Sequence, residues 1–156
     1  PYPGICRSLP EDVRMERLAN GELHALRLDS SRALEKAGNL QWHDLGIGVQ
    51  PVCMEKLGDV VLARKDIANS YHLAVCVDDA TQGVTLVTRG EDLIESTHVH
   101  RLLQHLLGFP VPQWHHHALL RDEQGRRFAK REECLSLRAI RASGKKATEV
   151  RRDLGF

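Results

Sequence analysis

The sequence lacks the features that would place the protein in a membrane or outside the cell. No apolar run approaches the roughly 20 residues that a helix needs to cross a bilayer, which excludes a transmembrane span. The chain opens on Pro-Tyr-Pro-Gly, without the basic flank and apolar stretch of a secretory signal. Its four cysteines include no CxxC pair, so we expect reduced thiols and a cytoplasmic location. These cysteines are Cys6, Cys53, Cys76 and Cys134.

Internal repeats, linkers rich in Pro, Gly or Ser, and an initiator Met are also missing. What is present is typical of an ordered globular domain with its own core: 42% hydrophobic and 28% charged residues in a chain of 156. The missing Met predicts that the chain has been processed or is part of something longer.

Charge is distributed unevenly along the chain, although the formal total is only +1. Residues 1–120 contain 11 Lys and Arg against 15 Asp and Glu, whereas residues 121–156 contain 11 against 6. The body is therefore mildly acidic and the tail is basic. A basic tail indicates an element that faces an anion, and the alternative is a solvated helical face.

Short apolar runs predict the strands of a parallel sheet. Three of them, residues 59–64, 71–77 and 83–89, are rich in β-branched residues, as strands buried on both faces are. Looser strand patterns occupy residues 23–28 and 114–120. Helical patterns alternate with these strands, which predicts an α/β layered domain.

The helical patterns have recognisable ends. A first helix is expected up to about residue 20, with Ser8 as its N-cap. A second begins at Thr97, continues through leucines at helical spacing and stops at Gly108 and Pro110. Two more helices are expected near residues 134–142 and 146–154, and the segment 30–57 is ambiguous.

Charged residues of both signs follow the three buried strand patterns: Arg64-Lys65-Asp66, Asp78-Asp79 and Arg89-Gly90-Glu91-Asp92. Ligands of parallel α/β sheets bind beyond the carboxyl ends of the strands, so we expect these groups to meet at one edge. An amino acid carries both signs of charge and suits such an edge.

Two clusters have the composition of a metal or acid–base site. Asp78 and Asp79 are adjacent on a segment expected to be extended, where neighbouring side chains point to opposite sides. That geometry favours one capping and one exposed carboxylate. In the run 115–117, two histidines share one face of a strand and the third takes the other, which disfavours a metal site.

Two basic features suit an anionic ligand. Arg89 precedes a glycine, where a backbone can approach a ligand and a guanidinium can bind a carboxylate through two bonds. An ion pair with Glu91 or Asp92 is the alternative. The densest positive cluster, residues 125–131, is interpreted either as a phosphate-binding loop or as a solvated one.

Three segments together resemble the second half of the glutamate-type class I aminoacyl-tRNA synthetase catalytic domain: NSYHLAVCVDD at 69–79, QGVT at 82–85 and RGEDL at 89–93. The chain is most similar to the short paralogues of that superfamily, the glutamyl-queuosine tRNA(Asp) synthetases. Its opening, residues 2–7, resembles the second half of their zinc-binding signature. The resemblance covers nearly the whole chain. It implies the C-terminal half of a Rossmann-like α/β domain, a parallel sheet with flanking helices, and a helical C-terminus.

The resemblance assigns roles to residues at matching positions. Tyr71 and Arg89 fall where the family holds its glutamate, which a phenol can hydrogen-bond and a guanidinium can pair with. Lys130 matches the second lysine of the family's Lys-Met-Ser-Lys-Ser-type loop, a catalytic group that steadies the phosphates of ATP. Arg127 occupies the position of the first lysine of that loop, and the resemblance implies that it also contacts ATP. The Met and first Ser positions of that loop are Phe and Ala here, so the loop keeps its charge and loses a hydroxyl.

Tyr2 and Cys6 match the last two of four zinc ligands, and the first two ligands have no counterpart in the chain. The family's His-Ile-Gly-His-type motif has no counterpart either, so we expect a C-terminal part of the enzyme. The implied parts are 1–57, the end of the zinc region and an inserted subdomain; 58–120, the second half of the catalytic domain; and 121–156, the phosphate loop and final helices.

The resemblance implies a ligase that activates glutamate with ATP and Mg²⁺ and transfers it to queuosine in the anticodon loop of tRNA(Asp). Zn²⁺ is implied for the intact family member, and the chain is expected to be monomeric, with no membrane partner. Two alternatives stay open. One is a non-catalytic paralogue that binds tRNA or another partner, and the other is a fragment of an ordinary glutamyl-tRNA synthetase.

Overall fold

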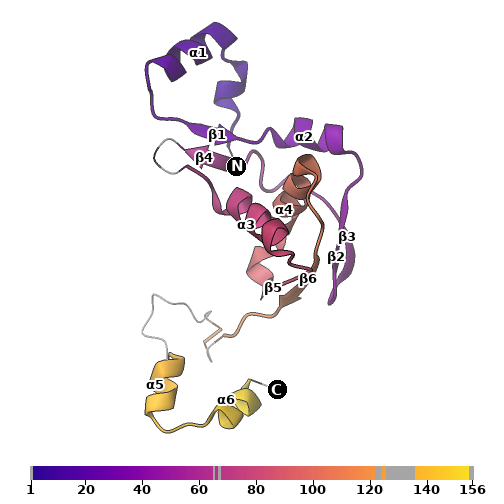
Figure 1. Ribbon diagram of the computed structural model, residues 1–156, viewed down its shortest axis with the longest axis vertical. Helices are drawn as coiled ribbons and strands as arrows, with labels where there is room; N and C mark the ends of the chain where they lie inside the picture. The colour runs from indigo at the N-terminus through magenta and orange to yellow at the C-terminus, as the bar shows by residue number, and fades with distance from the viewer. Residues whose placement is uncertain (1, 65, 67, 122–123, 126–135, 155–156) are drawn as a thin grey trace. The chain divides into compact units, whose positions relative to one another are not determined.

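The computed structural model describes residues 2–64, 66, 68–121, 124–125 and 136–154. The chain divides into two compact units, residues 1–118 and 119–156, and each is described by itself (Figure 1). The three-part division expected from the sequence, with its further boundary at residue 57, stays a prediction. Within the described residues, no helix is both long enough and apolar enough to cross a membrane.

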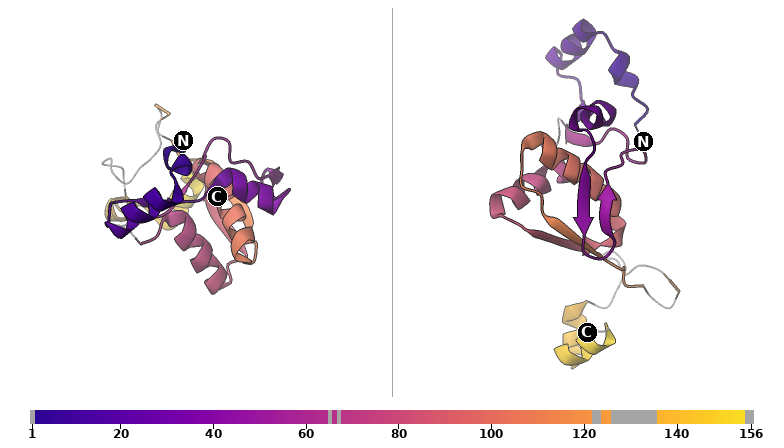
Figure 2. Two further views of the ribbon diagram at one scale, coloured as in Figure 1. Left: turned by 90° about the horizontal axis from the view of Figure 1, so that it is seen from above. Right: turned by 90° about the vertical axis from the view of Figure 1, so that its right-hand side faces the viewer.

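The larger sheet of the first unit has four strands in the order β3-β2-β6-β5. β2 (Gln41–Asp44) and β3 (Gly48–Pro51) form an antiparallel hairpin, which Figure 2 shows from the side. β6 (Gln113–His117) pairs in parallel with β2 and with β5 (Leu86–Gly90). The predicted α/β class with a parallel sheet and flanking helices is confirmed.

A separate two-stranded sheet pairs β1 (Ala25–Arg27) with β4 (Val61–Arg64) in antiparallel fashion. The strand patterns at 23–28 and 59–64 therefore predicted real strands. Placing the second of them in the parallel sheet was wrong, because strand pairing is decided by tertiary contacts that apolar content does not specify.

The run predicted as a strand at 71–77 is instead the start of helix α3 (Tyr71–Gln82). Ser70 caps this helix, with the Leu73 N–H donating to its Oγ at 3.4 Å, and Gly83 ends it with a φ of 68°. A polar N-cap and a left-handed glycine are strong end signals, and here they outweigh the apolar content between them.

The expected meeting of three charged groups at one sheet edge is consequently wrong. Arg64 ends a strand of the other sheet, and Asp78 and Asp79 lie on a helix. Only Arg89 lies at the carboxyl end of a strand in the parallel sheet.

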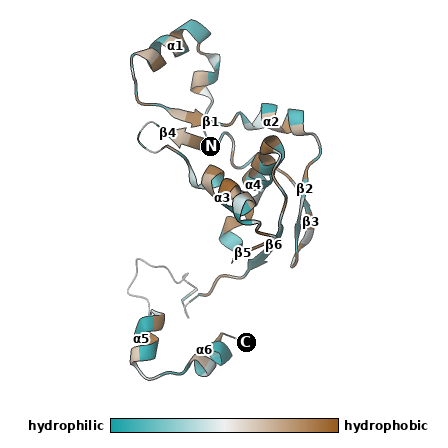
Figure 3. Cartoon of the chain, viewed as in Figure 1, coloured by the Kyte–Doolittle hydropathy of each residue, from teal (hydrophilic) through white to brown (hydrophobic). Residues whose placement is uncertain are grey.

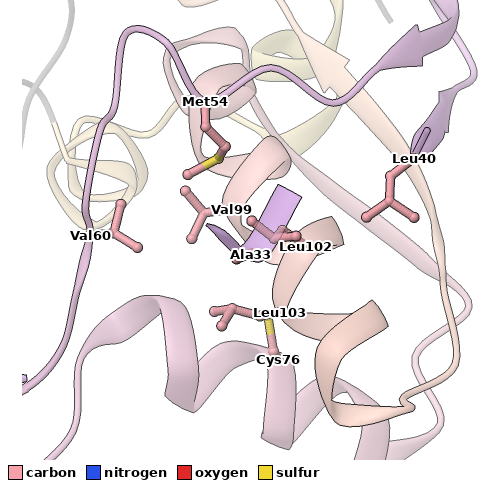
Figure 4. Close-up of a cluster of buried hydrophobic side chains, with 8 residues drawn as sticks. All are labelled: Ala33, Leu40, Met54, Val60, Cys76, Val99, Leu102 and Leu103. Carbon is pink, nitrogen blue, oxygen red and sulfur yellow. The ribbon is translucent and has the colours of Figure 1, made fainter. Parts of the chain in front are cut away.

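Helix α4 (Ile94–Leu107) forms as its leucine spacing predicts, and Gly108 ends it with a φ of 67°. Thr97 was expected to cap this helix but lies inside it, fully buried. α4 contributes three side chains to the apolar core, each worth about 1.5–3 kcal/mol when fully buried. The core cluster, drawn in Figure 4, consists of Ala33, Leu40, Met54, Val60, Cys76, Val99, Leu102 and Leu103.

The N-terminal part begins with a short 3-10 helix, η1 (Ile5–Ser8), followed by α1 (Glu11–Ala19). Ser8 was expected as the cap of this first helix, but the N-cap is Pro10. The ambiguous segment 30–57 contains α2 (Ser30–Ala37) and then the β2–β3 hairpin. Asp29 caps α2, with the Arg32 N–H donating to its carboxylate at 3.1 Å.

The second unit contains α5 (Leu137–Ala142) and α6 (Ala147–Asp153), close to the helices predicted near 134–142 and 146–154. Ser136 caps α5 by accepting the Ala139 N–H at 3.1 Å. Figure 3 shows hydrophilic residues along most of α6, and neither helix contains a buried residue.

Candidate functional site

Tyr71 and Arg89, the two residues predicted to hold glutamate, lie together in the first unit. Tyr71 is the first residue of α3, and its side chain is exposed. Arg89 is next to last in β5 and is half-buried. Burial lowers the pKa of Arg89, whereas the charge of Tyr71 and a hydrogen bond to its phenol raise it. A guanidinium is charged at neutral pH, so the site presents a cation.

Besides Tyr71, three polar side chains hold the Arg89 guanidinium. Its Nε lies 3.2 Å from His116 Nε2, and its Nη1 lies 3.0 Å from His100 Nδ1. Its Nη2 donates to the Thr97 hydroxyl oxygen. Guanidinium has five N–H groups and no acceptor, so these bonds use only some of its donors.

The partner on β6 is in turn held by a buried carboxylate. His116 Nδ1 lies 2.6 Å from Asp44 Oδ2, and both side chains are almost completely buried. Burial lowers the pKa of His116, as does the charge of Arg89, although the hydrogen bond to Asp44 raises it. Burial by itself raises the pKa of Asp44, but bonds from His116, Gly46 and Ile47 outweigh this and leave it lowered. The pair is therefore a carboxylate with a neutral imidazole.

A second histidine chain approaches Arg89 from the helices. His100 Nε2 lies 3.1 Å from His72 Nδ1, and the Tyr71 ring meets the His100 ring edge-on at 5.6 Å. Burial, with the charges of Arg89 and His72, lowers the pKa of His100 to about 3. Burial and Arg89 also lower the pKa of His72. Both rings are neutral at physiological pH.

Sequence reasoning missed four members of this cluster: Asp44, His72, Thr97 and His100. Asp44 is far along the chain from the others, and although His72 directly follows Tyr71, nothing in the sequence links β2 to β6 or α4 to β5. A partial signal existed for His116, since strand alternation separates it from its two neighbours. The alternation is confirmed, with His116 facing inward and His115 and His117 exposed.

Asp78 and Asp79 do not have the geometry expected of them, because they lie on a helix rather than on an extended segment. Burial raises the pKa of Asp79, and the charge of Asp78 adds to this while the charge of Arg89 opposes it. Within the described residues, which leave out 122–123 and 126–135 among others, no group of three or more His, Cys, Asp or Glu is suited to a metal ion.

The two predicted zinc ligands lie close together at the start of the first unit. The backbone N–H of Cys6 donates to the Tyr2 phenol oxygen at 2.8 Å, and the Arg27 guanidinium lies 4.4 Å from the centre of the Tyr2 ring. Structural zinc takes four ligands, and these two supply half of such a set. Zinc binding stays a prediction.

Lys130 and Arg127, predicted to contact ATP, lie outside the described residues, as does Cys134.

The comparisons with known proteins indicate one family. The family "tRNA synthetases class I (E and Q), catalytic domain" matches residues 2–153. The chain is 44% identical to the glutamyl-Q tRNA(Asp) synthetase of Rhodobacter capsulatus, over 99% of this chain and 56% of that protein. It is 42% identical to the same enzyme of Nocardia farcinica, over 96% and 45%. It thus spans about half the length of these curated relatives.

More distant likenesses are to glutamate–tRNA ligases. The Thermus thermophilus ligase is 36% identical over 92% of this chain and 30% of its own. A crystal structure of a glutamate tRNA ligase from Elizabethkingia meningosepticum, in complex with its amino acid, has a TM-score of 0.65 at 26% identity. That match covers 92% of this chain and 28% of the ligase.

Proposed function

Because the chain belongs to the class I tRNA synthetase (E and Q) catalytic-domain family, we propose that it is part of a ligase that activates glutamate with ATP and transfers it to queuosine in the anticodon loop of tRNA(Asp). Glutamate activation is common to the relatives described above. Transfer to queuosine of tRNA(Asp) is favoured over charging of tRNA(Glu) because identity is higher to the glutamyl-Q tRNA(Asp) synthetases than to the glutamate–tRNA ligases.

The observation that carries the proposal is the position of Arg89 at the carboxyl end of β5, next to Tyr71 at the start of α3. A guanidinium fixed by neutral partners, next to an exposed phenol, suits a carboxylate ligand that also needs a hydrogen bond. In parallel α/β sheets this edge is where ligands bind. We assign Arg89 the role of pairing with a carboxylate of glutamate and Tyr71 the role of a hydrogen-bonding partner.

The chemistry asked of these residues is positioning rather than bond-making. A glutamate carboxylate oxygen attacks the α-phosphorus of ATP in line, forming glutamyl-adenylate and releasing pyrophosphate. A queuosine hydroxyl then attacks the acyl carbon, forming an ester and releasing AMP. Arg89 and Tyr71 hold glutamate in register for the first attack, and a correctly oriented reactant lowers such a barrier by several kcal/mol.

Lys130 and Arg127 are proposed to contact the ATP phosphates, where a preorganised positive charge is worth about 10²–10³ in rate. Mg²⁺ would accompany the ATP phosphates. A monomeric state and a cytoplasmic location also stay predictions.

The decisive experiment measures transfer of radiolabelled glutamate by the protein produced from the complete reading frame that encodes this chain. Three acceptors are compared: tRNA(Asp) with queuosine, tRNA(Asp) without it, and tRNA(Glu). We expect acid-stable, base-labile label on the first acceptor alone, because only it carries the proposed nucleophile.

Two other results would contradict the proposal and would each identify a different protein. Label on tRNA(Glu) identifies an ordinary glutamyl-tRNA synthetase. Binding of tRNA without any ATP–pyrophosphate exchange in the presence of glutamate identifies a non-catalytic paralogue.

A further inference from the structure

The Arg89 guanidinium is oriented by groups that cannot neutralise it. His116 Nε2 faces the Nε of Arg89 at 3.2 Å and the hydroxyl of Thr97 at 3.1 Å. Arginine can only donate, so Nε2 must present its lone pair, and the single proton of a neutral ring then sits on Nδ1. That proton points at Asp44 Oδ2, 2.6 Å away. The carboxylate therefore selects the tautomer that can accept from Arg89.

The carboxylate itself is fixed by the turn of the β2–β3 hairpin. Asp44 Oδ1 accepts the N–H groups of Gly46 at 2.7 Å and Ile47 at 3.1 Å. Asp44 Oδ2 also accepts the backbone N–H of His116 at 3.1 Å. This bond from the His116 backbone to the Asp44 carboxylate already ties β2 to β6, so the fold does not need the imidazole for that link. The ring remains available to align the guanidinium.

The groups that face Arg89 from the packed elements are consistent with this role. α3 contributes Tyr71, His72 and Asp79, and α4 contributes Thr97 and His100. Asp79 is the carboxylate among them, and burial raises its pKa. His100 must also be neutral and accept at Nδ1, because it faces an N–H of the same guanidinium at 3.0 Å.

We propose that the Asp44–His116 pair is a positioning device for substrate binding: the carboxylate fixes the imidazole tautomer, and the imidazole fixes the plane of the Arg89 guanidinium toward the ligand carboxylate. The consequence for glutamate rests on the proposed function of Arg89, whereas the alignment of Arg89 does not. His116 is a positioning residue that acts through Arg89 and does not touch the ligand.

The test uses two substitutions that separate the two ring nitrogens. His116→Asn retains a donor near the Nδ1 position for Asp44 but has no acceptor at the Nε2 position. His116→Gln places an amide oxygen near the Nε2 position and loses the bond to Asp44. His115→Asn is the matched control, because this exposed histidine is the preceding residue of the same strand.

Two readouts are recorded on the protein made from the complete reading frame. The first is the Arg89 Nε–H signal in ¹⁵N NMR spectra, assigned by its loss in Arg89→Lys. The second is affinity for glutamate, compared with affinity for ATP. We expect His116→Asn to move the Arg89 signal toward that of a free arginine and to weaken glutamate binding by about tenfold, the scale of one hydrogen bond to a charged group. Affinity for ATP stays unchanged.

His116→Gln should return glutamate affinity to within about threefold of the original, since a hydrogen bond to a charged group is regained. His115→Asn should change neither readout. The proposal is overturned if His116→Asn leaves the Arg89 signal in place, or if glutamate affinity, ATP affinity and melting temperature fall together. If His116→Asn does not fold, the Arg89 signal of His116→Gln decides, and a signal like that of free arginine overturns the proposal.

Failure of the proposed function has a different signature. In that case the unsubstituted protein does not bind glutamate, while the Arg89 signal still responds to His116→Asn.

Discussion

Two aspartates buried in the first unit, Asp59 and Asp44, are paired with arginine in different ways. Asp59 binds Arg7 directly, with its Oδ2 accepting from Arg7 Nε at 2.9 Å and its Oδ1 accepting from Arg7 Nη2. Asp44 binds His116, and Arg89 lies on the far side of the imidazole. The first arrangement is an ion pair, and the second is an ion pair with a neutral ring inserted.

The difference determines what each arginine can do next. Hydrogen bonding to Asp59 raises the pKa of Arg7, because the carboxylate stabilises the charged guanidinium. Burial lowers the pKa of Arg89, although its hydrogen bond to Tyr71 and the charge of Asp79 oppose this. An ion pair uses the charge of an arginine to join two elements. An inserted imidazole aligns the arginine and leaves its charge for a ligand.

The largest expected difference between the surroundings of Arg89 and those of Arg7 is in how folding stability depends on acid pH. The pKa of His100 is lowered to about 3 in the folded protein, against about 6.5 in an unfolded chain. Protons therefore favour the unfolded state below about pH 6.5, and stability that is complete above that pH is lost as the pH falls toward 3. The pKa of Asp59 is also lowered, because bonds from Arg7 and Ser30 outweigh its burial, but its contribution is lost only below about pH 4.

Urea unfolding between pH 7 and 4.5 measures this difference. Stability should fall by on the order of 3 kcal/mol, at about 1.4 kcal/mol for each pKa unit crossed, and His100→Gln should flatten the fall. His105→Gln is the control, because His105 is exposed on the same helix. Equal pH slopes for the original protein and His100→Gln would show that a different group titrates.

Removing each arginine should produce opposite phenotypes. Arg89→Ala should weaken glutamate binding by about a hundredfold or more, since the ligand carboxylate loses its charge partner. Arg7→Ala should lower the melting temperature and change glutamate affinity by less than about twofold, because Arg7 joins η1 to Asp59. Calorimetric titration with glutamate and thermal melting of both variants test the pair. A comparable loss of glutamate affinity in both would remove the functional distinction between them.

A smaller effect is expected from the turn that holds Asp44. A Cβ added at Gly46 would lie 3.2 Å from Asp44 Oδ1, so the carboxylate must shift by a few tenths of an ångström. Gly46→Ala should weaken glutamate binding by about three- to tenfold, the scale of a partly lost hydrogen bond. Leu45→Ala, an exposed position in the same turn, should bind glutamate normally. Equal glutamate affinities of the two variants would show that the position of the Asp44 carboxylate in this turn does not affect glutamate binding.

Local signals predicted the parts of the fold that depend on local interactions. The leucine spacing and Gly108 were sufficient for α4, and the run 83–89 anticipated β5 (Leu86–Gly90). The run 71–77 misled because its apolar content fits a strand, whereas the cap at Ser70 and the stop at Gly83 make it helical. Membership of β4 in a separate sheet depends on pairing with β1, a long-range choice that periodicity does not encode.

The candidate site likewise contains residues that the sequence indicated and residues that it did not. Arg89 was indicated by the residues around it and again by the family resemblance, whereas Tyr71 came from the resemblance alone. The structure brings the two together, and their roles stay a prediction. Asp44 and His116 are 72 positions apart, and their contact depends on the parallel pairing of β2 with β6. A single sequence contains no signal for such a contact.

Strand β6 contains three successive histidines, and the middle one, His116, faces inward on the same side of the strand as Trp114. Pairing that slips by one residue turns every side chain to the other face, yet His115 or His117 would then bring another imidazole to the inward position. Trp114 has no such substitute, and its edge-on contact with Trp42 at 5.8 Å would be lost. The histidine run therefore does not specify the register of β6. The free energy that disfavours a shifted register during folding comes from the Trp42–Trp114 contact.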